Sequence, residues 1–281
     1  MPDIQSQKSK ALAFRAMHQG PKILVLPNAW DVASARIFED AGFGAIATTS
    51  AGIAFSLGYP DGQKIARDEM LARVTRIARA VNVPVTADVE SGYGSRPEDA
   101  ARTAREVIEE GGVGMNLEDS TGDPVNPLVD LSLQVEKIRA VREAALKTGV
   151  LLVLNARTDV FLLKIGVEEK RYDEVVRRLV AFRDAGAECV FAPGLSDAKI
   201  IERLAKDVKC PLNILAGPGF PSVPELEKLG VARVSLGSGP MRATLGLVRR
   251  IAEELKSAGT YEMLEGAVPY ADVNELMKRD H

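Results

Sequence analysis

The chain has 281 residues, of which 46% are hydrophobic and 27% charged, and its formal net charge is −3 at pH 7. Acidic and basic residues are mixed, and no basic tract predicts binding to nucleic acid. No apolar run reaches the roughly 18 residues of a membrane-spanning helix, and the first ten residues lack the apolar core of a signal peptide. Cys189 and Cys210 form no CxxC motif, so we expect free thiols and a cytoplasmic location.

The predicted elements begin with a helix at residues 6–18 and then alternate. Apolar, strand-like runs recur about every 30 residues, at residues 23–29, 44–50, 83–90, 113–119, 150–159, 188–193, 211–216 and 233–237. Helical patterns with one apolar face occupy residues 67–80, 97–109, 131–147, 172–185, 197–208 and 240–258. Several of these helices are followed by a glycine just before the next strand, as in Asp184-Ala185-Gly186, which predicts a left-handed helix end there.

Short apolar strands that alternate with helices indicate parallel βαβ units. Eight such units favour an α/β fold of the (β/α)8 TIM-barrel type over an open doubly wound sheet. No Gly-x-Gly-x-x-Gly follows the first strand, which weakens a dinucleotide-binding alternative. We therefore expect a single domain, residues 1–281, with a barrel core at about 21–258. The tail, residues 259–281, has a helical pattern at 273–278 and is not needed to close the barrel, so we expect it to pack elsewhere, such as on another subunit.

Carboxylates mark the ends of three neighbouring strands. Asp88 and Glu90 lie two residues apart, so an extended backbone points both to the same face. Glu118 ends the next strand, and Arg157 and Asp159 end the one after it. The carboxyl ends of barrel strands form the active site of this fold class, and unpaired carboxylates are costly to desolvate there without a cation. Oxygen ligands of this kind predict Mg2+, with Mn2+ as the alternative.

Some of these polar residues also have a structural interpretation. Asp119 and Asp159 suit the role of a helix cap or of a partner to a metal ligand. Arg157 at a buried strand end needs an anionic partner, which is either Glu118 or a substrate carboxylate. The sequence leaves both alternatives open.

Four motifs, in order, resemble the isocitrate lyase/phosphoenolpyruvate mutase superfamily. They are Thr48-Thr49-Ser50-Ala51-Gly52 with Leu57-Gly58-Tyr59-Pro60-Asp61, Ala87-Asp88-Val89-Glu90-Ser91-Gly92-Tyr93-Gly94, Asn116-Leu117-Glu118-Asp119 and Ala156-Arg157-Thr158-Asp159. The resemblance implies a (β/α)8 barrel that binds Mg2+ and a 2-oxo or 2-hydroxy carboxylate, and that forms or cleaves C–C or P–C bonds through an enolate-like intermediate. It also implies a homodimer or homotetramer, because many members exchange the eighth helix between subunits.

The resemblance assigns roles to individual residues. Asp88 would bind the metal directly, while Asp61, Glu90 and Glu118 would hold it largely through its water ligands. Arg157 would stabilise the enolate oxygen or a carboxylate, and with Glu118 and Asp61 it completes the implied catalytic set. The implied substrate-binding residues are Thr49, Ser50, Ala51, Asp88, Asn126, Arg157 and Asn213, of which the first three would hold the substrate carboxylate by hydroxyl and backbone N–H groups.

The loop after Glu118 departs from the known members. It reads Ser120-Thr121-Gly122-Asp123-Pro124-Val125-Asn126-Pro127, without the Lys-Lys/Arg-Cys-Gly-His of isocitrate and methylisocitrate lyases, whose Cys protonates the enolate. Phosphoenolpyruvate mutase has a Lys-x-Asn here, and Asn126 matches its Asn whereas Pro124 replaces its Lys.

The activity expected from these motifs is that of a Mg2+-dependent C–C lyase or decarboxylase that forms an enolate from a small 2-oxo or 2-hydroxy (di)carboxylate. An oxaloacetate-like molecule is the expected substrate, and decarboxylation requires the fewest additional groups because CO2 departs without a general base. The alternatives are a P–C bond mutase or hydrolase and a metal-dependent 2-oxo-acid-binding protein without catalysis. Neither nucleic acid nor a membrane is an expected partner.

Overall fold

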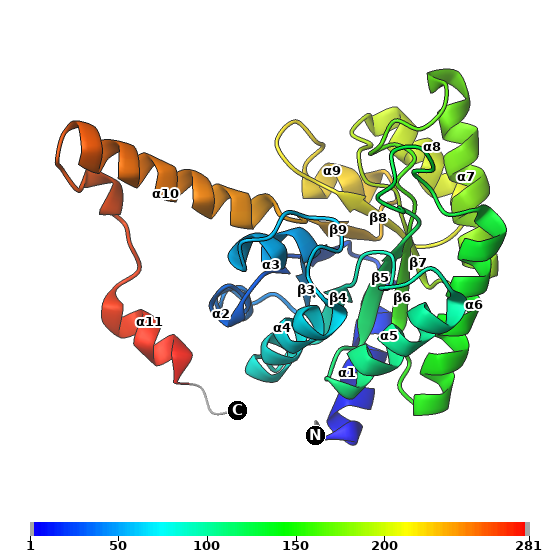
Figure 1. Ribbon diagram of the computed structural model, residues 1–281, viewed down its shortest axis with the longest axis horizontal. Helices are drawn as coiled ribbons and strands as arrows, with labels where there is room; N and C mark the ends of the chain where they lie inside the picture. Colours follow the sequence, from blue (N-terminus) through cyan, green and yellow to red (C-terminus); the bar gives the residue numbers. More distant parts are fainter. Residues whose placement is uncertain (1–2, 279–281) are drawn as a thin grey trace.

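The computed structural model describes residues 3–278, so the end of the predicted tail, residues 279–281, lies outside the described part. The strands form one parallel sheet in the order β1-β9-β8-β7-β6-β5-β4-β3-β2. β1 (Leu24–Leu26) and β2 (Asn28–Ala29) are two pieces of one segment, interrupted at Pro27, which has no N–H to donate. Because β1 pairs with β9 and β2 pairs with β3, the sheet curls round on itself as a TIM-type barrel (Figure 1).

Each remaining strand lies within a run that the sequence predicts. The strands are β3 (Ile46–Thr48), β4 (Val85–Asp88), β5 (Gly114–Glu118), β6 (Val153–Arg157), β7 (Cys189–Phe191), β8 (Leu212–Leu215) and β9 (Arg233–Ser235). Most end before the predicted run does. At the carboxyl ends of β4, β5 and β6, the residues that follow each strand form loops. These loops line the acid-rich end of the barrel, its mouth.

Most helices surround the barrel, whereas α10 extends away from it and leads to α11, whose end contacts α2 (Figure 1). The helices are α1 (Ile4–Met17), α2 (Val32–Asp40), α3 (Ser50–Ser56), α4 (Arg67–Ala80), α5 (Pro97–Glu109), α6 (Leu131–Thr148), α7 (Glu168–Asp184), α8 (Ala198–Val208), α9 (Val223–Lys228), α10 (Gly239–Ser257) and α11 (Tyr270–Met277), with a 3-10 turn at Glu262–Leu264. The predicted helical ranges omit α2, α3 and α9, although Asp40-Ala41-Gly42 and Lys228-Leu229-Gly230 indicate where α2 and α9 end. Gly186 follows α7 with φ +109°, which confirms the predicted left-handed helix end.

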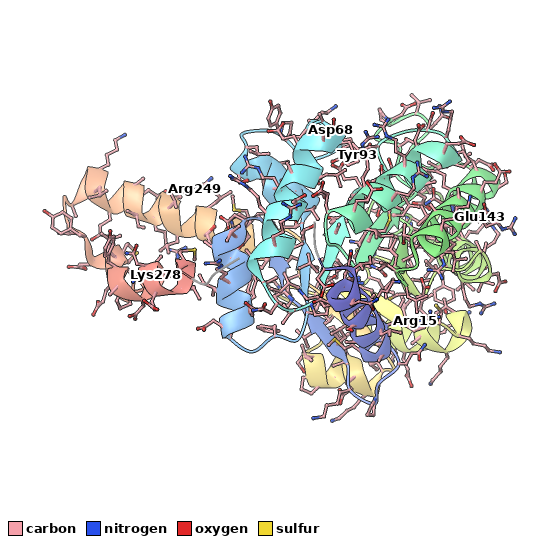
Figure 2. The ribbon with its side chains drawn as sticks, turned by 90° about the horizontal axis from the view of Figure 1, so that it is seen from below. Arg15, Asp68, Tyr93, Glu143, Arg249 and Lys278 are labelled. Atoms are coloured by element: carbon pink, nitrogen blue, oxygen red, sulfur yellow. The ribbon has the colours of Figure 1, made fainter. Side chains whose placement is uncertain are left out.

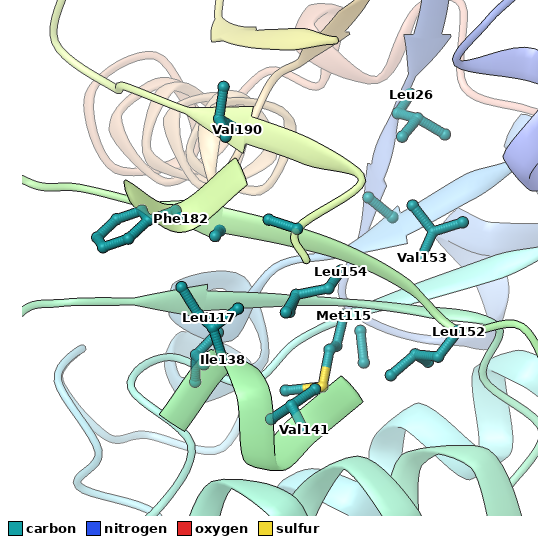
Figure 3. Packing of buried hydrophobic residues seen from close by; sticks show 14 of the residues in the cluster. Leu26, Met115, Leu117, Ile138, Val141, Leu152, Val153, Leu154, Phe182 and Val190 are labelled. Carbon is teal, nitrogen blue, oxygen red and sulfur yellow. The ribbon is translucent and has the colours of Figure 1, made fainter. Parts of the chain in front are cut away.

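The core lies between the strands and the surrounding helices. Figure 3 shows Met115 and Leu117 of β5 beside Ile138 and Val141 of α6, and all four side chains are buried. α1 packs against the amino-terminal end of the barrel, where its Phe14 is fully buried. That contact needs Gly114, because a Cβ at this position would lie 2.8 Å from the Phe14 ring.

The C-terminal part of the chain contacts the barrel sparsely. α10 has 19 residues, of which only Met241 is buried, and Figure 2 shows Arg249 of α10 on this projecting part. α11 returns to α2, where the Leu276 carbonyl accepts a hydrogen bond from Arg36 at 2.9 Å. In the described part of the chain, no helix is long and apolar enough to span a membrane, and Cys189 and Cys210 are free thiols as predicted.

Candidate active site

Asp88 is the central acid at the carboxyl end of the barrel. It is the last residue of β4 and is 8% exposed. Its Oδ2 accepts hydrogen bonds from the backbone N–H and the hydroxyl of Ser50, at 3.0 and 2.8 Å, and its Oδ1 lies 3.4 Å from Asn116 Nδ2. Its own N–H donates to Thr48 Oγ1 at 2.8 Å. The carboxylate is therefore fixed in direction, and Oδ1 is its less engaged oxygen.

Glu90 follows β4 in a strained backbone conformation. Its φ is +53°, and Tyr93 three residues later has φ +56°. Left-handed conformations of non-glycine residues cost free energy and gather at functional sites. The Glu90 carboxylate accepts a hydrogen bond from the Gln63 N–H at 2.5 Å and a long one from the Tyr93 hydroxyl at 3.4 Å. The strained turn thus points a buried carboxylate back toward the mouth, beside Asp88.

Arg157 joins the acids that end β5 and β6. Its Nη1 lies 2.8 Å from Glu118 Oε2, and its Nε and Nη2 donate to the two carboxylate oxygens of Asp159 at 2.5 and 2.9 Å. Residues Glu118 and Arg157 are register partners in adjacent strands, and the guanidinium carbon lies 5.7 Å from the centre of the Phe191 ring. The structure therefore gives Arg157 the Glu118 partner that the sequence left open, and adds Asp159.

The crowding of acids changes their protonation. Burial, and then the charges of Asp88 and Asp61, raise the pKa of Glu90 to about 7. Burial raises the pKa of Glu118 well above its ordinary value, although Arg157 opposes the shift. Partial desolvation and the Asp88 charge also raise the pKa of Asp61, which belongs to the exposed loop after α3. The cluster is therefore electrostatically unfavourable by itself, and a cation would stabilise its ionised form.

The donor set fits a hard divalent cation with water ligands. Among residues 3–278, no three His, Cys, Asp or Glu side chains converge tightly enough to hold a metal by themselves. Mg2+ usually takes one or two carboxylates directly and keeps several waters. Asp88, with its lightly engaged Oδ1, suits the direct ligand, while Glu90, Glu118 and Asp61 suit contacts through water.

A buried carboxylate, Asp119, supports the loop behind the mouth. Asp119 is fully buried and accepts hydrogen bonds from the Thr158 hydroxyl at 2.7 Å, the Asp159 N–H at 2.9 Å and Arg178 Nη1 at 3.0 Å. Burial raises the pKa of Asp119 to about 6, against the effect of these donors. Asp119 thus holds the backbone of Asp159 in place, which agrees with the supporting role considered for it. Arg178 of α7 had no signal in the sequence because its partner is 59 residues away.

The substrate-carboxylate motif is linked to the acid cluster. Thr49 caps α3, its Oγ1 accepting from the Gly52 N–H at 3.2 Å, and both donors of Ser50 are engaged with Asp88. Ala51 lies 9% exposed in the first turn of α3. The structure therefore brings these three residues to the mouth, and their contact with a substrate stays a prediction.

The two asparagines of the implied site lie in different places. Asn213 of β8 is fully buried inside the barrel, where it exchanges hydrogen bonds of 3.2 and 3.3 Å with Ser235. Asn126 is exposed in the loop after β5 and contacts Asp123 of the same loop. It lines a pocket of about 350 Å³ together with Ile165. The structure thus places Asn213 in the barrel interior, and within residues 3–278 no hydrogen bond joins the Asn126 side chain to the acid cluster.

Comparison with known proteins identifies the family of this site. The family model for phosphoenolpyruvate phosphomutase matches residues 14–256. The chain belongs to this family. Its fold is shared by a solved Burkholderia cenocepacia J2315 protein that has been assigned only provisionally as a lyase or mutase, with 40% identity, a TM-score of 0.92, and coverage of 98% of this chain and 97% of the other.

Two of the curated relatives are named as enzymes that break carbon–carbon bonds. The 2-methylisocitrate lyase of Bacillus subtilis is 30% identical over 74% of this chain and 67% of its own length. The oxaloacetate decarboxylase of Pseudomonas fluorescens is 28% identical over 87% of this chain and 84% of its own. These names place C–C lyases among the relatives and leave the substrate of this chain undefined.

Proposed function

We propose that this protein is a Mg2+-dependent carbon–carbon lyase or decarboxylase that acts on a small 2-oxo or 2-hydroxy dicarboxylate, with oxaloacetate as the first candidate. The observation that carries the proposal is the set of three acids and one arginine, Asp88, Glu90, Glu118 and Arg157, at the carboxyl ends of β4, β5 and β6. The named relatives support the C–C class. A single domain and a cytoplasmic location are part of the same proposal.

The residues at the mouth suit the formation of an enolate. Bound Mg2+ would supply Lewis-acid polarisation of the 2-oxo oxygen. Asp88 would hold the ion, and the Arg157 guanidinium would place fixed positive charge where negative charge develops on the enolate oxygen. In oxaloacetate the bond between C3 and the distal carboxylate breaks, CO2 leaves, and the electron pair stays as the pyruvate enolate, which then takes a proton from solvent at C3.

The described residues favour decarboxylation over retro-aldol cleavage. A retro-aldol reaction needs both a base for the hydroxyl and an acid for the enolate carbon. The loop of residues 120–127 contains no Cys, Lys or His. Cys189 begins β7 and Cys210 precedes β8, at the opposite end of the barrel from the mouth, and burial raises the pKa of each thiol to about 12. No thiol of this chain is thus available to protonate the product.

The alternatives have weaker support. P–C bond chemistry needs a cation for the phosphoryl group in addition to the metal, but Pro124 stands where the mutase has Lys, and the Asn126 side chain contacts Asp123 of its own loop. A binding protein without catalysis would show no turnover in the assay described next.

The test is turnover of a substrate panel by the purified protein. We expect pyruvate to be released from oxaloacetate in the presence of Mg2+ and not after chelation. D88A should abolish this activity without lowering the melting temperature, whereas D68A, which alters an exposed acid of α4, should retain it. Release of no 2-oxo acid from any 2-oxo or 2-hydroxy dicarboxylate would contradict the proposal, and turnover of phosphonopyruvate alone would favour P–C chemistry.

We also propose that the protein is a homo-oligomer assembled through α10. This helix exposes Leu245, Leu247, Val248 and Leu255 by between 39% and 60%. An apolar surface of this kind on a projecting helix is typical of a protein–protein interface. A second copy of the chain is the occupant that the family resemblance implies.

A further inference from the structure

Arg233 is a buried cation for which the mouth described above has no role. It is the first residue of β9, its side chain is 0% exposed, and it lies inside the barrel. Within residues 3–278 its Nε and Nη1 have no hydrogen-bond partner, and no ion pair involving it is present. Burying a guanidinium without a carboxylate partner costs several kcal/mol. The hydrogen bond that Arg233 donates therefore indicates the role of this buried residue.

That hydrogen bond leads to the proposed metal ligand through an asparagine. Arg233 Nη2 donates to Asn116 Oδ1 at 3.4 Å, and Asn155 Nδ2 donates to the same oxygen at 2.8 Å. Because two donors occupy the carbonyl end of the amide, the NH2 end must point the other way. It points to Asp88, whose Oδ1 lies 3.4 Å from Asn116 Nδ2.

The strand register explains why these groups meet. Asn116 of β5 is the register partner of both Asp88 in β4 and Asn155 in β6, so the three side chains stand at one level of the barrel. Arg233 reaches this level from β9, on the other side of the interior. Burial lowers the pKa of Arg233, while the nearby Cys189 and then the charge of Asp88 favour the ionised guanidinium.

We propose that Arg233 is a positioning residue for the cation site: it orients the Asn116 amide, and this amide in turn fixes the Asp88 carboxylate in the direction needed to bind the metal. The inference rests on the proposed function, because it takes Asp88 as the metal ligand. Partners behind a metal ligand typically change metal affinity by about 10- to 100-fold when they are removed.

The test is a double-mutant cycle read out by metal binding instead of by activity. Mn2+ binding to the full chain is measured by electron paramagnetic resonance for the wild type, R233M, N116L and the double variant. We expect each single variant to bind Mn2+ about 10- to 100-fold more weakly. The double variant should be no weaker than the weaker single variant, since both changes break the same link. V190A, which alters a buried residue of β7 outside this link, should bind within about twofold of the wild type.

The outcomes separate this inference from the proposed function. If the wild type binds Mn2+ and R233M binds equally well, or if the two single effects multiply in the double variant, Arg233 does not position the ligand. If the wild type itself does not bind Mn2+, the proposed metal-dependent function fails and this inference fails with it. Melting curves in the presence of chelator establish which variants are folded. If R233M does not fold, R233K replaces it in the same cycle, because it keeps the charge but lacks the guanidinium.

Discussion

Asp88 ends β4 and Asp119 directly follows the neighbouring strand β5, yet the protein surrounds their carboxylates differently. Asp119 is enclosed by Thr158, the Asp159 N–H and Arg178 at 3.0 Å or less, so its oxygens are fully engaged. Asp88 has two close donors on Oδ2 and one long contact on Oδ1. The same residue type is therefore a structural anchor in one place and an available ligand in the other.

The role of Arg157 can be tested without changing its charge. R157K keeps a cation but loses the paired hydrogen bonds to Asp159 and cannot contact Glu118 at the same time. We expect kcat for oxaloacetate to fall by about 100-fold, whereas the dissociation constant for Mn2+ should change little because Arg157 is not a ligand. Steady-state kinetics and metal titration of the same preparation give both numbers. An unchanged kcat would remove Arg157 from the mechanism.

His18 predicts a dependence of stability on pH. It is 4% exposed, and its Nδ1 contacts the Phe14 carbonyl at 2.8 Å. Burial, and then the charge of Arg233, lower its pKa from 6.5 to about 4. Below pH 6.5 the unfolded chain therefore takes up a proton that the folded protein does not, so this residue destabilises the fold progressively as the pH falls toward 4.

Urea unfolding of the wild type and H18Q at pH 7 and pH 4.5 measures this effect. The wild type should lose roughly 2–3 kcal/mol more unfolding free energy between the two pH values than H18Q does. Equal losses in the two proteins would mean that His18 is protonated in the folded state.

At the scale of the elements, the sequence predicts the strands well and the short helices poorly. Apolar runs identify every barrel strand. They do not reveal that the first strand is divided at Pro27, where β1 pairs with β9 and β2 pairs with β3. α3 and α9 have seven and six residues, too few to show a helical period. α3 also begins at Ser50, inside a predicted strand, because Thr49 caps it.

The candidate site was predictable as a set of residues but not as a set of contacts. Motifs and strand ends indicated Asp88, Glu90, Glu118 and Arg157. The bond from Ser50 to Asp88 and that from Arg233 to Asn116 join residues 38 and 117 positions apart. Such pairs are set by barrel closure and register, which no local pattern in one sequence reveals.

α1 provides a stability prediction at this scale. Phe14 is fully buried against the amino-terminal end of the barrel, whereas Leu12 on the same helix is 57% exposed. F14A should lower the unfolding free energy by about 3–5 kcal/mol, because it leaves a cavity beside Thr86 and Gly114. L12A is the matched control and should change it by less than about 0.5 kcal/mol. Comparable effects in chemical denaturation would show that α1 is not part of the core.

For the whole molecule, eight repeated units predicted the barrel, and the family resemblance implied that the eighth helix is exchanged between subunits instead of covering its own barrel. The apolar pattern of α10 suits a helix packed on the eighth strand, whereas in this chain it projects from the barrel with only Met241 buried (Figure 1). A single sequence shows that a helix has an apolar face and does not show which chain covers that face.

The association state tests this arrangement. The wild type should sediment as a dimer or larger species at micromolar concentration, and L245E/V248E should shift it toward the monomer, because each change would bury a charge in the interface. R249A, an exposed change on the same helix, should leave the association state unaltered. A wild type that is monomeric at every concentration in analytical ultracentrifugation would contradict the proposed oligomer.

The loop after β5 is attached so that it can change during divergence of the family without altering the cation site. The loop is joined to the body at its base, where Val129 donates to the Asp119 carbonyl at 2.7 Å and Ser120 pairs with Leu128. Its interior residues contact one another, as Asp123 does with Asn126, and none of the acids of the mouth lies on it. Mutation could therefore replace the loop and alter the reaction while the cation site stays intact, so that new activities arise on an inherited centre.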